Sequence, residues 1–322
     1  MIGSLRKLPI DSNLVILVLL LVLAGFASPF FWTSENLLNV LRAASLIGIV
    51  AVGMNVVIIT GGIDLSVGSV VAFVGVLAAS LVMTGWPPLV ALLFPLLAAM
   101  VIGLANGSMV AFLGFQPFVA TLVMMTVVRG MGLVYTDGQP IYVDYPPVID
   151  FLSRGSVLGI PSPAILFLLV TILTWYVMRY RAIGRQIYII GSNEHAAHLA
   201  GIPVQQVKLV AYIFCGALAG LSGLILTARM GSGEPGQAGV FWELDAIAAV
   251  VIGGTALQGG RGSVWGAFVG ALVIGIVSNL FNLKGVDPEW QNIAKGAIIL
   301  FAVLVASLRD RARVDRIKRG TT

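Results

Sequence analysis

The chain has 322 residues, of which 58% are hydrophobic and only 10% are charged. Soluble domains carry about 25% charged residues, so this chain has too few charges to cover a water-exposed surface. Its net charge of +5 fits the topology of a membrane protein better than nucleic-acid binding, and its single cysteine, Cys215, excludes an internal disulfide.

Ten apolar windows follow one another along the chain, most of them near the 20 residues that a membrane span needs. They cover 14–32, 41–60, 65–84, 89–113, 117–135, 164–180, 209–228, 244–257, 264–280 and 290–308. All are predicted to be helices, because an open sheet would leave backbone groups unpaired in lipid. Window 244–257 is too short to span unaided, which predicts a half-helix or a re-entrant segment. The expected fold is an all-α polytopic membrane protein of about ten helices, forming one domain over residues 1–322.

Lysine and arginine residues are distributed unevenly between the connections, and this asymmetry predicts orientation. With the N-terminus inside, the cytoplasmic segments hold Arg6, Lys7, Arg179, Arg181, Arg185, Lys208, Arg261 and the basic tail 309–322. The outer segments hold Arg154, Arg229 and Lys284 together with seven acidic residues. We therefore expect both termini and the loop 181–208 in the cytoplasm, and the loop 136–163 outside.

The inner loop contains a short helix signal within "GSNEHAAHLAGIPV". Asn193 is a plausible N-cap and Glu194 suits the positive helix start, whereas Gly201 can close the helix and Pro203 forbids its continuation. The small residues Ala196, Ala197 and Ala200 would let this helix enter a groove on a partner protein. We expect Glu194 to pair with a basic residue on that partner.

A first glycine-rich break, "GGIDLSVGS", follows the second window. Gly61 and Gly62 end one helix in a tight turn, and Asp64 begins the next, where a carboxylate can accept hydrogen bonds from free N–H groups. Two interpretations stay open for Asp64: a helix cap, or a polar group at a transport pathway or its gate. Further candidates for that pathway or its gate are Asn55, Gly61, Gly62, Ser66, Asn106, Arg129, Gly259 and Gly260.

A second break, residues 254–259, has the glycine spacing of a phosphate-binding loop. Gly260 follows where that motif requires lysine, so the chain is not expected to bind ATP there.

Small-residue pairs at 103/107, 216/220 and 266/270 predict close helix packing. No catalytic set of residues is present, and His195 with His198 offers too few ligands for a metal. The sequence therefore indicates a conduit and not an enzyme.

Four stretches resemble the membrane subunits of bacterial ABC importers for monosaccharides, particularly the ribose permease family. They are "GGIDLSVGS" at 61–69, "FVATLVMMTVVRGMGLVYTDGQPI" at 118–141, "GSNEHAAHLAGI" at 191–202 and "ELDAIAAVVIGGTALQGGRGSVWG" at 243–266. The resemblance covers nearly the whole chain in order. It implies that the segment 191–201 is the coupling helix that sits in a groove on the ATPase.

The resemblance also implies partners: an ATP-binding subunit with two fused cassettes, a secreted sugar-binding protein, and a second permease copy or paralogue. ATP and magnesium would bind the ATPase, with no cofactor on this chain, in a bacterial inner membrane. The expected function is import of a monosaccharide, ribose first, by alternating access. The alternative is an ion-coupled secondary transporter, which also uses broken helices but predicts a titratable residue central to its pathway.

Overall fold

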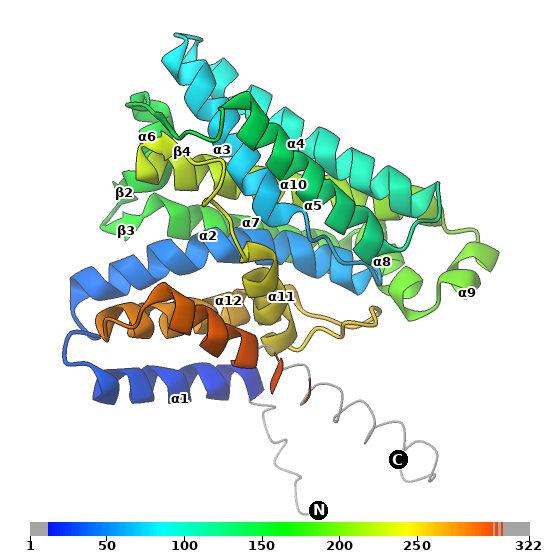
Figure 1. Ribbon diagram of the computed structural model, residues 1–322. Helices are drawn as coiled ribbons and strands as arrows, with labels where there is room; N and C mark the ends of the chain where they lie inside the picture. Colours follow the sequence, from blue (N-terminus) through cyan, green and yellow to red (C-terminus); the bar gives the residue numbers. More distant parts are fainter. Residues whose placement is uncertain (1–11, 299, 302–303, 305–322) are drawn as a thin grey trace, which may run out of the picture.

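The computed structural model describes residues 12–298, 300–301 and 304, so the basic tail 309–322 lies outside the described residues. The described chain is a bundle of helices with a few two-residue strands (Figure 1). The helices are α1 Ser12–Ala27, α2 Ser34–Ile59, α3 Val67–Met83, α4 Pro88–Ala111, α5 Pro117–Tyr135, α6 Pro147–Arg154, α7 Ser162–Tyr180, α8 Ala182–Ser192, α9 Glu194–Leu199, α10 Val204–Met230, α11 Trp242–Ile252 and α12 Val264–Leu283. Residues 288–298 are also helical.

Six of the described helices are long and apolar enough to cross a membrane: α2, α4, α5, α7, α10 and α12. α1 and α3 are apolar but shorter. The window 244–257 is helical only as far as Ile252, in α11, which has 11 residues. The prediction that this window is too short to span unaided is therefore confirmed. The multi-pass helical architecture is confirmed, whereas the count of ten spans stays a prediction.

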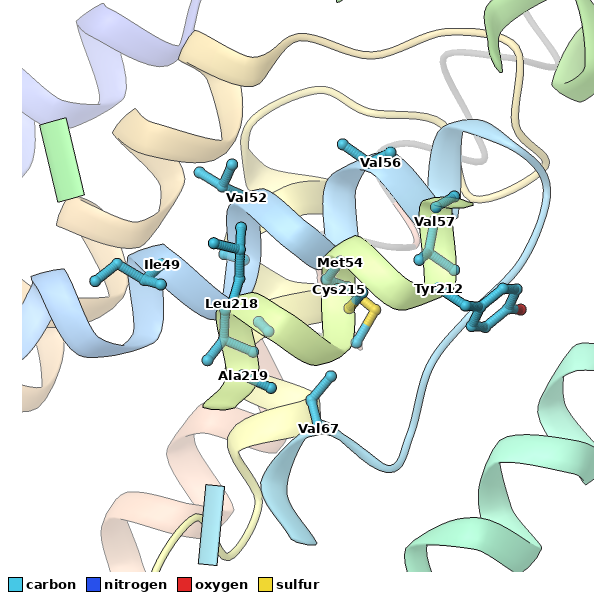
Figure 2. Close-up of a cluster of buried hydrophobic side chains, with 14 of the residues drawn as sticks. Ile49, Val52, Met54, Val56, Val57, Val67, Tyr212, Cys215, Leu218 and Ala219 are labelled. Atoms are coloured by element: carbon cyan, nitrogen blue, oxygen red, sulfur yellow. The ribbon is translucent and has the colours of Figure 1, made fainter. Parts of the chain in front are cut away.

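The core forms around α2, α3 and α10, and α10 also packs along α4. Met54 on α2, Val67 on α3 and both Tyr212 and Cys215 on α10 are fully buried there (Figure 2). α2 is buried along most of its length, as expected for a helix surrounded by others. α4 and α5 keep most of their apolar side chains on the surface of the single chain.

Small residues let the backbones approach closely at the predicted pairs. A Cβ added at Gly103 would lie 2.5 Å from the Tyr212 carbonyl oxygen, and one at Gly216 would lie 2.5 Å from that of Ala99. Gly266 and Gly270 similarly leave no room for a Cβ against the backbone of α11. The packing prediction for all three pairs is therefore confirmed.

The two long connections contain more structure than the sequence analysis expected. The outer one carries α6, a short pairing of β2 (Ser156–Val157) with β3 (Ile160–Pro161), and β1 (Ile141–Tyr142), which pairs with β4 (Ser232–Gly233). In that connection, burial raises the pKa of Tyr145 to about 12, and its hydroxyl forms a hydrogen bond with the Thr227 hydroxyl at 3.2 Å. Figure 1 places α6, β2 and β3 at one end of the bundle and α8 and α9 at the other.

The inner connection contains a second helix that the sequence analysis did not predict. α8 precedes the 193–200 segment and has 11 residues. α8 buries Gly184, Ile187 and Ile190 on one face and exposes Arg185 and Ile189.

Candidate transport site and coupling junction

A buried polar cluster lies in the break between α2 and α3. The Asp64 carboxylate is 1% exposed and accepts from the Ser66 backbone N–H at 2.9 Å and the Ser66 hydroxyl at 2.6 Å. The Asn106 amide, from α4, donates to Asp64 at 3.3 Å and to the Ser66 hydroxyl oxygen at 2.8 Å. Asp64 therefore holds the turn before α3 and links it to α4. The N-cap of α3 is Ser66, two residues later, so the choice between a helix cap and a pathway group for Asp64 stays open.

A second buried pair joins α2 to the loop after α11. The Thr255 hydroxyl donates to the Asn55 side-chain oxygen at 2.7 Å, and both residues are almost fully buried. The Asn55 amide nitrogen and the Asn106 amide oxygen have no hydrogen-bond partner among the described residues. A buried polar atom without a partner costs about 1–3 kcal/mol, which makes these two positions sensitive to any rearrangement of the helices.

The two glycine-rich breaks, far apart in sequence, meet at the end of α8. The Gly260 N–H donates to the Ile59 carbonyl at 2.9 Å, joining the loop 253–263 to the end of α2. A Cβ on Gly259 would lie 2.8 Å from the Gly61 nitrogen, and one on Gly260 would lie 2.5 Å from the Ser192 hydroxyl. A Cβ on Gly191 would overlap the Ile59 carbonyl oxygen. We call Gly61, Gly191, Gly259 and Gly260 the glycine junction.

Gly61, Gly259 and Gly260 also have positive φ, at +87°, +87° and +71°, which L-residues adopt only with strain. Gly62 lies beside the junction, where a Cβ would be 2.5 Å from the Tyr212 hydroxyl. Backbone conformation favours glycine at 61, contact requires it at 62 and 191, and both apply at 259 and 260. Three chain segments can therefore cross where side chains would separate them.

α9 forms as predicted. The Asn193 side chain accepts from the Ala196 N–H at 2.9 Å, and Gly201 takes φ +75° after the helix ends. The helix therefore begins and ends at the predicted signals.

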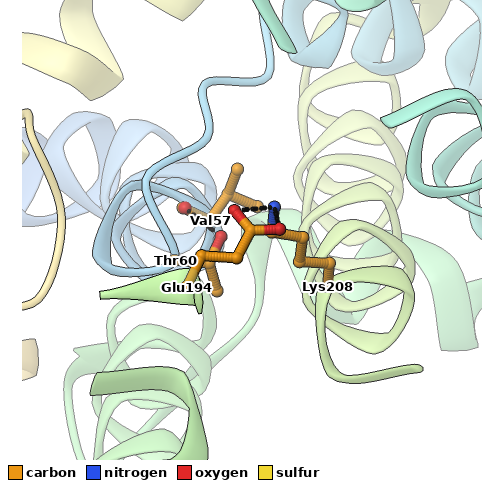
Figure 3. A network of polar contacts seen from close by, with 4 residues as sticks. All are labelled: Val57, Thr60, Glu194 and Lys208. Atoms are coloured by element: carbon orange, nitrogen blue, oxygen red, sulfur yellow. Dashed lines mark hydrogen bonds and ion pairs between the residues drawn. The ribbon is translucent and has the colours of Figure 1, made fainter. Parts of the chain in front are cut away.

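One detail of the α9 prediction is wrong, and a second stays a prediction. Glu194 pairs with Lys208 of the same chain at 2.7 Å (Figure 3), but its side chain is 58% exposed, so a contact with a basic residue on a partner stays a prediction. Ala197 is fully buried against its own chain, so it cannot enter a partner's groove. The exposed side of α9 instead carries Ala196, Leu199 and Ala200, and Leu199 is 75% exposed.

A mostly polar cavity of about 510 Å³ lies between α9, the glycine junction and the turn before α5. Its lining includes Asn193, Glu194 and Lys208 on one side and Gly61 and Gly62 on the other. The predicted coupling segment and the first glycine-rich break therefore share one cavity, although about 130 residues separate them.

The remaining candidate, Arg129, lies away from this group. Its guanidinium donates to the Pro235 carbonyl at 3.0 Å and the Ala238 carbonyl at 2.8 Å, which fixes the segment before α11. Nearby, Lys295 pairs with Asp245 of α11 at 2.9 Å, and this carboxylate side chain is 6% exposed. Arg129 therefore holds the segment before α11, and Lys295 holds the first turn of α11.

A family described as the branched-chain amino acid transport system permease component matches residues 36–303. The chain belongs to this family. The ribose import permease protein of Haemophilus influenzae is 44% identical over 297 residues, covering 91% of this chain and 92% of the relative. That of Bacillus subtilis is 43% identical over 306 residues, covering 94% and 93%. The galactofuranose transporter permease protein of Escherichia coli is 36% identical over 305 residues, covering 92% and 89%. No solved structure matches significantly.

The protein is therefore a multi-pass membrane permease, a transport component and not an enzyme. Sequence reasoning missed three parts of its site: Gly191 in the junction, Lys208 as the partner of Glu194, and Leu199 on the exposed side of α9. The permease's α8 has an amphipathic pattern in "AIGRQIYIIGS" that could have predicted the helix. Nothing in the sequence indicates which segments that helix meets.

Proposed function

We propose that this permease is the membrane-spanning subunit of an ATP-driven importer for a monosaccharide, with ribose as the first substrate to test. The observation that supports this most is similarity over nearly the full length to two proteins named ribose import permeases, at 43–44% identity. Relatives named for galactofuranose and D-allose are 36% and 35% identical. The similarity therefore favours a monosaccharide and, within that class, ribose.

The proposed assembly contains an ATP-binding subunit with two fused cassettes, an extracellular or periplasmic sugar-binding protein, and a second permease copy or paralogue. ATP and magnesium would bind the ATPase, because residues 254–260 lack the lysine of a phosphate-binding loop. We place the assembly in a bacterial inner membrane with both termini inside. The cluster of Arg179, Arg181, Arg185 and Lys208 at the α8–α9 end supports that orientation.

In this proposal, α9 docks on the ATPase through its exposed side. Leu199 supplies an apolar contact, and Ala196 and Ala200 allow close approach. The ion pair between Glu194 and Lys208 ties α9 to the start of α10, so the two move together. Exposed pairs contribute little stability, about 0.2–1 kcal/mol, so we assign this one to positioning.

The glycine junction is the proposed route from α9 to the pathway. Movement of α8 at Gly191 must move Ile59 at the end of α2, or Gly260 in the loop after α11, because no space separates them. Beyond the junction lie the pairs Asn55–Thr255 and Asp64–Asn106, which are the proposed gate. A neutral sugar requires hydrogen-bonding groups, which the Asn55 and Asn106 amides, the Thr255 hydroxyl and the Asp64 carboxylate can provide after rearrangement.

Reconstitution in proteoliposomes tests the proposal. The permease, its ATPase and a sugar-binding protein encoded beside it are combined, and uptake of radiolabelled ribose is measured with and without ATP. We expect uptake that needs all three proteins and ATP and that persists when ion gradients are collapsed. Uptake by the permease alone, driven by a proton or sodium gradient, would contradict the proposal in favour of the secondary transporter.

A further inference from the structure

A groove on the permease surface lies between α2, α7, α8 and α10. It has a volume of about 360 Å³. Its lining includes Val170 and Val177 on α7, Ile183 and Ile187 on α8, and Val210 and Phe214 on α10. Neither the gate nor the glycine junction contributes a residue to it.

The groove offers no free polar group to a ligand. Thr174 is the only polar residue in the lining, and its hydroxyl already donates to the Val170 carbonyl at 2.7 Å. A sugar or a water molecule would lose hydrogen bonds there, because apolar cavities of this kind stay dry. The occupant must therefore be apolar. From Val170 to Val177 the groove follows α7 for about 10 Å, at 1.5 Å per residue.

One end of the groove is basic. Residues 177–210 contain four cations, Arg179, Arg181, Arg185 and Lys208, and one acid, Glu194, which Lys208 already pairs with. Arg181 lies over the Tyr176 ring at 5.4 Å, and Arg185 donates to the Tyr180 carbonyl at 3.4 Å. Both guanidinium groups are therefore held at the end of α7, next to the lining residues Val177 and Ile183.

We propose that this groove holds one acyl chain of an anionic phospholipid, whose phosphate lies against Arg181 and Arg185. The apolar lining selects the chain, and the basic end selects the headgroup, since basic pockets between membrane helices attract anionic lipids. Placement in the inner leaflet follows from the proposed topology. Binding itself requires neither the ATPase nor a sugar, so it is measured independently of the transport proposal.

The experiment uses the full-length permease, reconstituted in vesicles of equal parts phosphatidylglycerol and phosphatidylethanolamine. The protein is extracted in mild detergent, and native mass spectrometry counts the lipids that it retains. Val210→Trp fills the groove, and Val127→Trp on α5 is the matched control, because the two valines are 45% and 49% exposed. Arg181→Gln with Arg185→Gln removes the basic end, with Lys284→Gln as control.

We expect the wild type to retain phosphatidylglycerol in preference to phosphatidylethanolamine. Val210→Trp should weaken that retention about tenfold, the effect of losing burial of two methylene groups. The double arginine variant should weaken it about thirtyfold, with little change for phosphatidylethanolamine. Both controls should behave as the wild type does.

Three results would overturn the proposal. One is equal retention of the two lipids by the wild type, which would show that the basic end selects nothing. Another is a Val210→Trp variant that retains phosphatidylglycerol as well as Val127→Trp does. The third is a Val210→Trp variant that keeps its lipid but shifts from paired to single permease subunits, which would assign the groove to a second copy of the chain.

Discussion

Replacing Gly191 with alanine tests the glycine junction directly. The added methyl group would overlap the Ile59 carbonyl oxygen, which belongs to the backbone and cannot rotate away. Overpacking of this kind costs about 1–3 kcal/mol. Gly191 lies in the last turn of α8, so alanine also gains helix propensity, at most about 1 kcal/mol. We therefore expect α8 to move away from α2, with the chain still folded and inserted.

Gly130→Ala is the control, because Gly130 lies in α5 and a Cβ there meets nothing within 4 Å. Helix propensity acts in both variants, so their difference in thermal unfolding isolates the overlap at Gly191. In the reconstituted transporter we expect ATP-dependent ribose uptake to fall about 5- to 150-fold for Gly191→Ala, the usual range of a coupling free energy. ATPase subunits should still co-purify. Uptake by Gly191→Ala equal to that of Gly130→Ala would refute the idea that force passes through this contact.

Three further predictions concern the gate, the docking side and the topology. Asp64→Asn should keep most uptake, because an amide oxygen can still accept from the Ser66 N–H. Asp64→Leu should lose both hydrogen bonds from Ser66, each worth about 0.5–1.5 kcal/mol in unfolding measurements. Equal loss of uptake in both variants at normal expression would show that the charge itself matters. Leu199→Glu should abolish co-purification of the ATPase without changing permease stability, and intact co-purification would move the docking surface elsewhere. An impermeant thiol reagent applied from outside should label an Asp144→Cys variant and not a His198→Cys variant. The buried Cys215 gives the background signal. The reverse labelling pattern would show that the topology is inverted.

Helices with strong local signals were predictable from sequence. α5 begins at Pro117 and ends at Tyr135 as the apolar window predicts, and α9 has its cap at Asn193 because a short polar side chain there satisfies a free N–H. Membrane helices are readable in this way because lipid requires long uninterrupted apolar runs. The short length of α11 was predictable for the same reason, since its apolar run is too short.

Contacts between distant segments were not predictable. Glu194 carries a charge that any cation could neutralise, and only the fold brings Lys208 to it. Ala197 and Leu199 both suit a helix surface, and their burial depends on how α9 rests on its own chain. The two glycine-rich breaks could be recognised separately as turns, but their meeting with Gly191 depends on the paths of α2, α8 and the loop 253–263. Spacing along the chain contains no information on such crossings.

The loop 253–263 is held at points that make it suited to transmit force in the proposed mechanism. At its start, Gly253 lies against Gly266 of α12 with no space for a Cβ, and the start of α11 is fixed by the pair Asp245–Lys295. At its far end, the Gly260 N–H donates a hydrogen bond to the Ile59 carbonyl, and Gly260 lies against Ser192. A displacement of α8 therefore cannot be absorbed by sliding of α11 and must bend the loop between these points. Thr255 lies within that bend and holds Asn55, so the first hydrogen bond expected to change is the one between these two buried side chains.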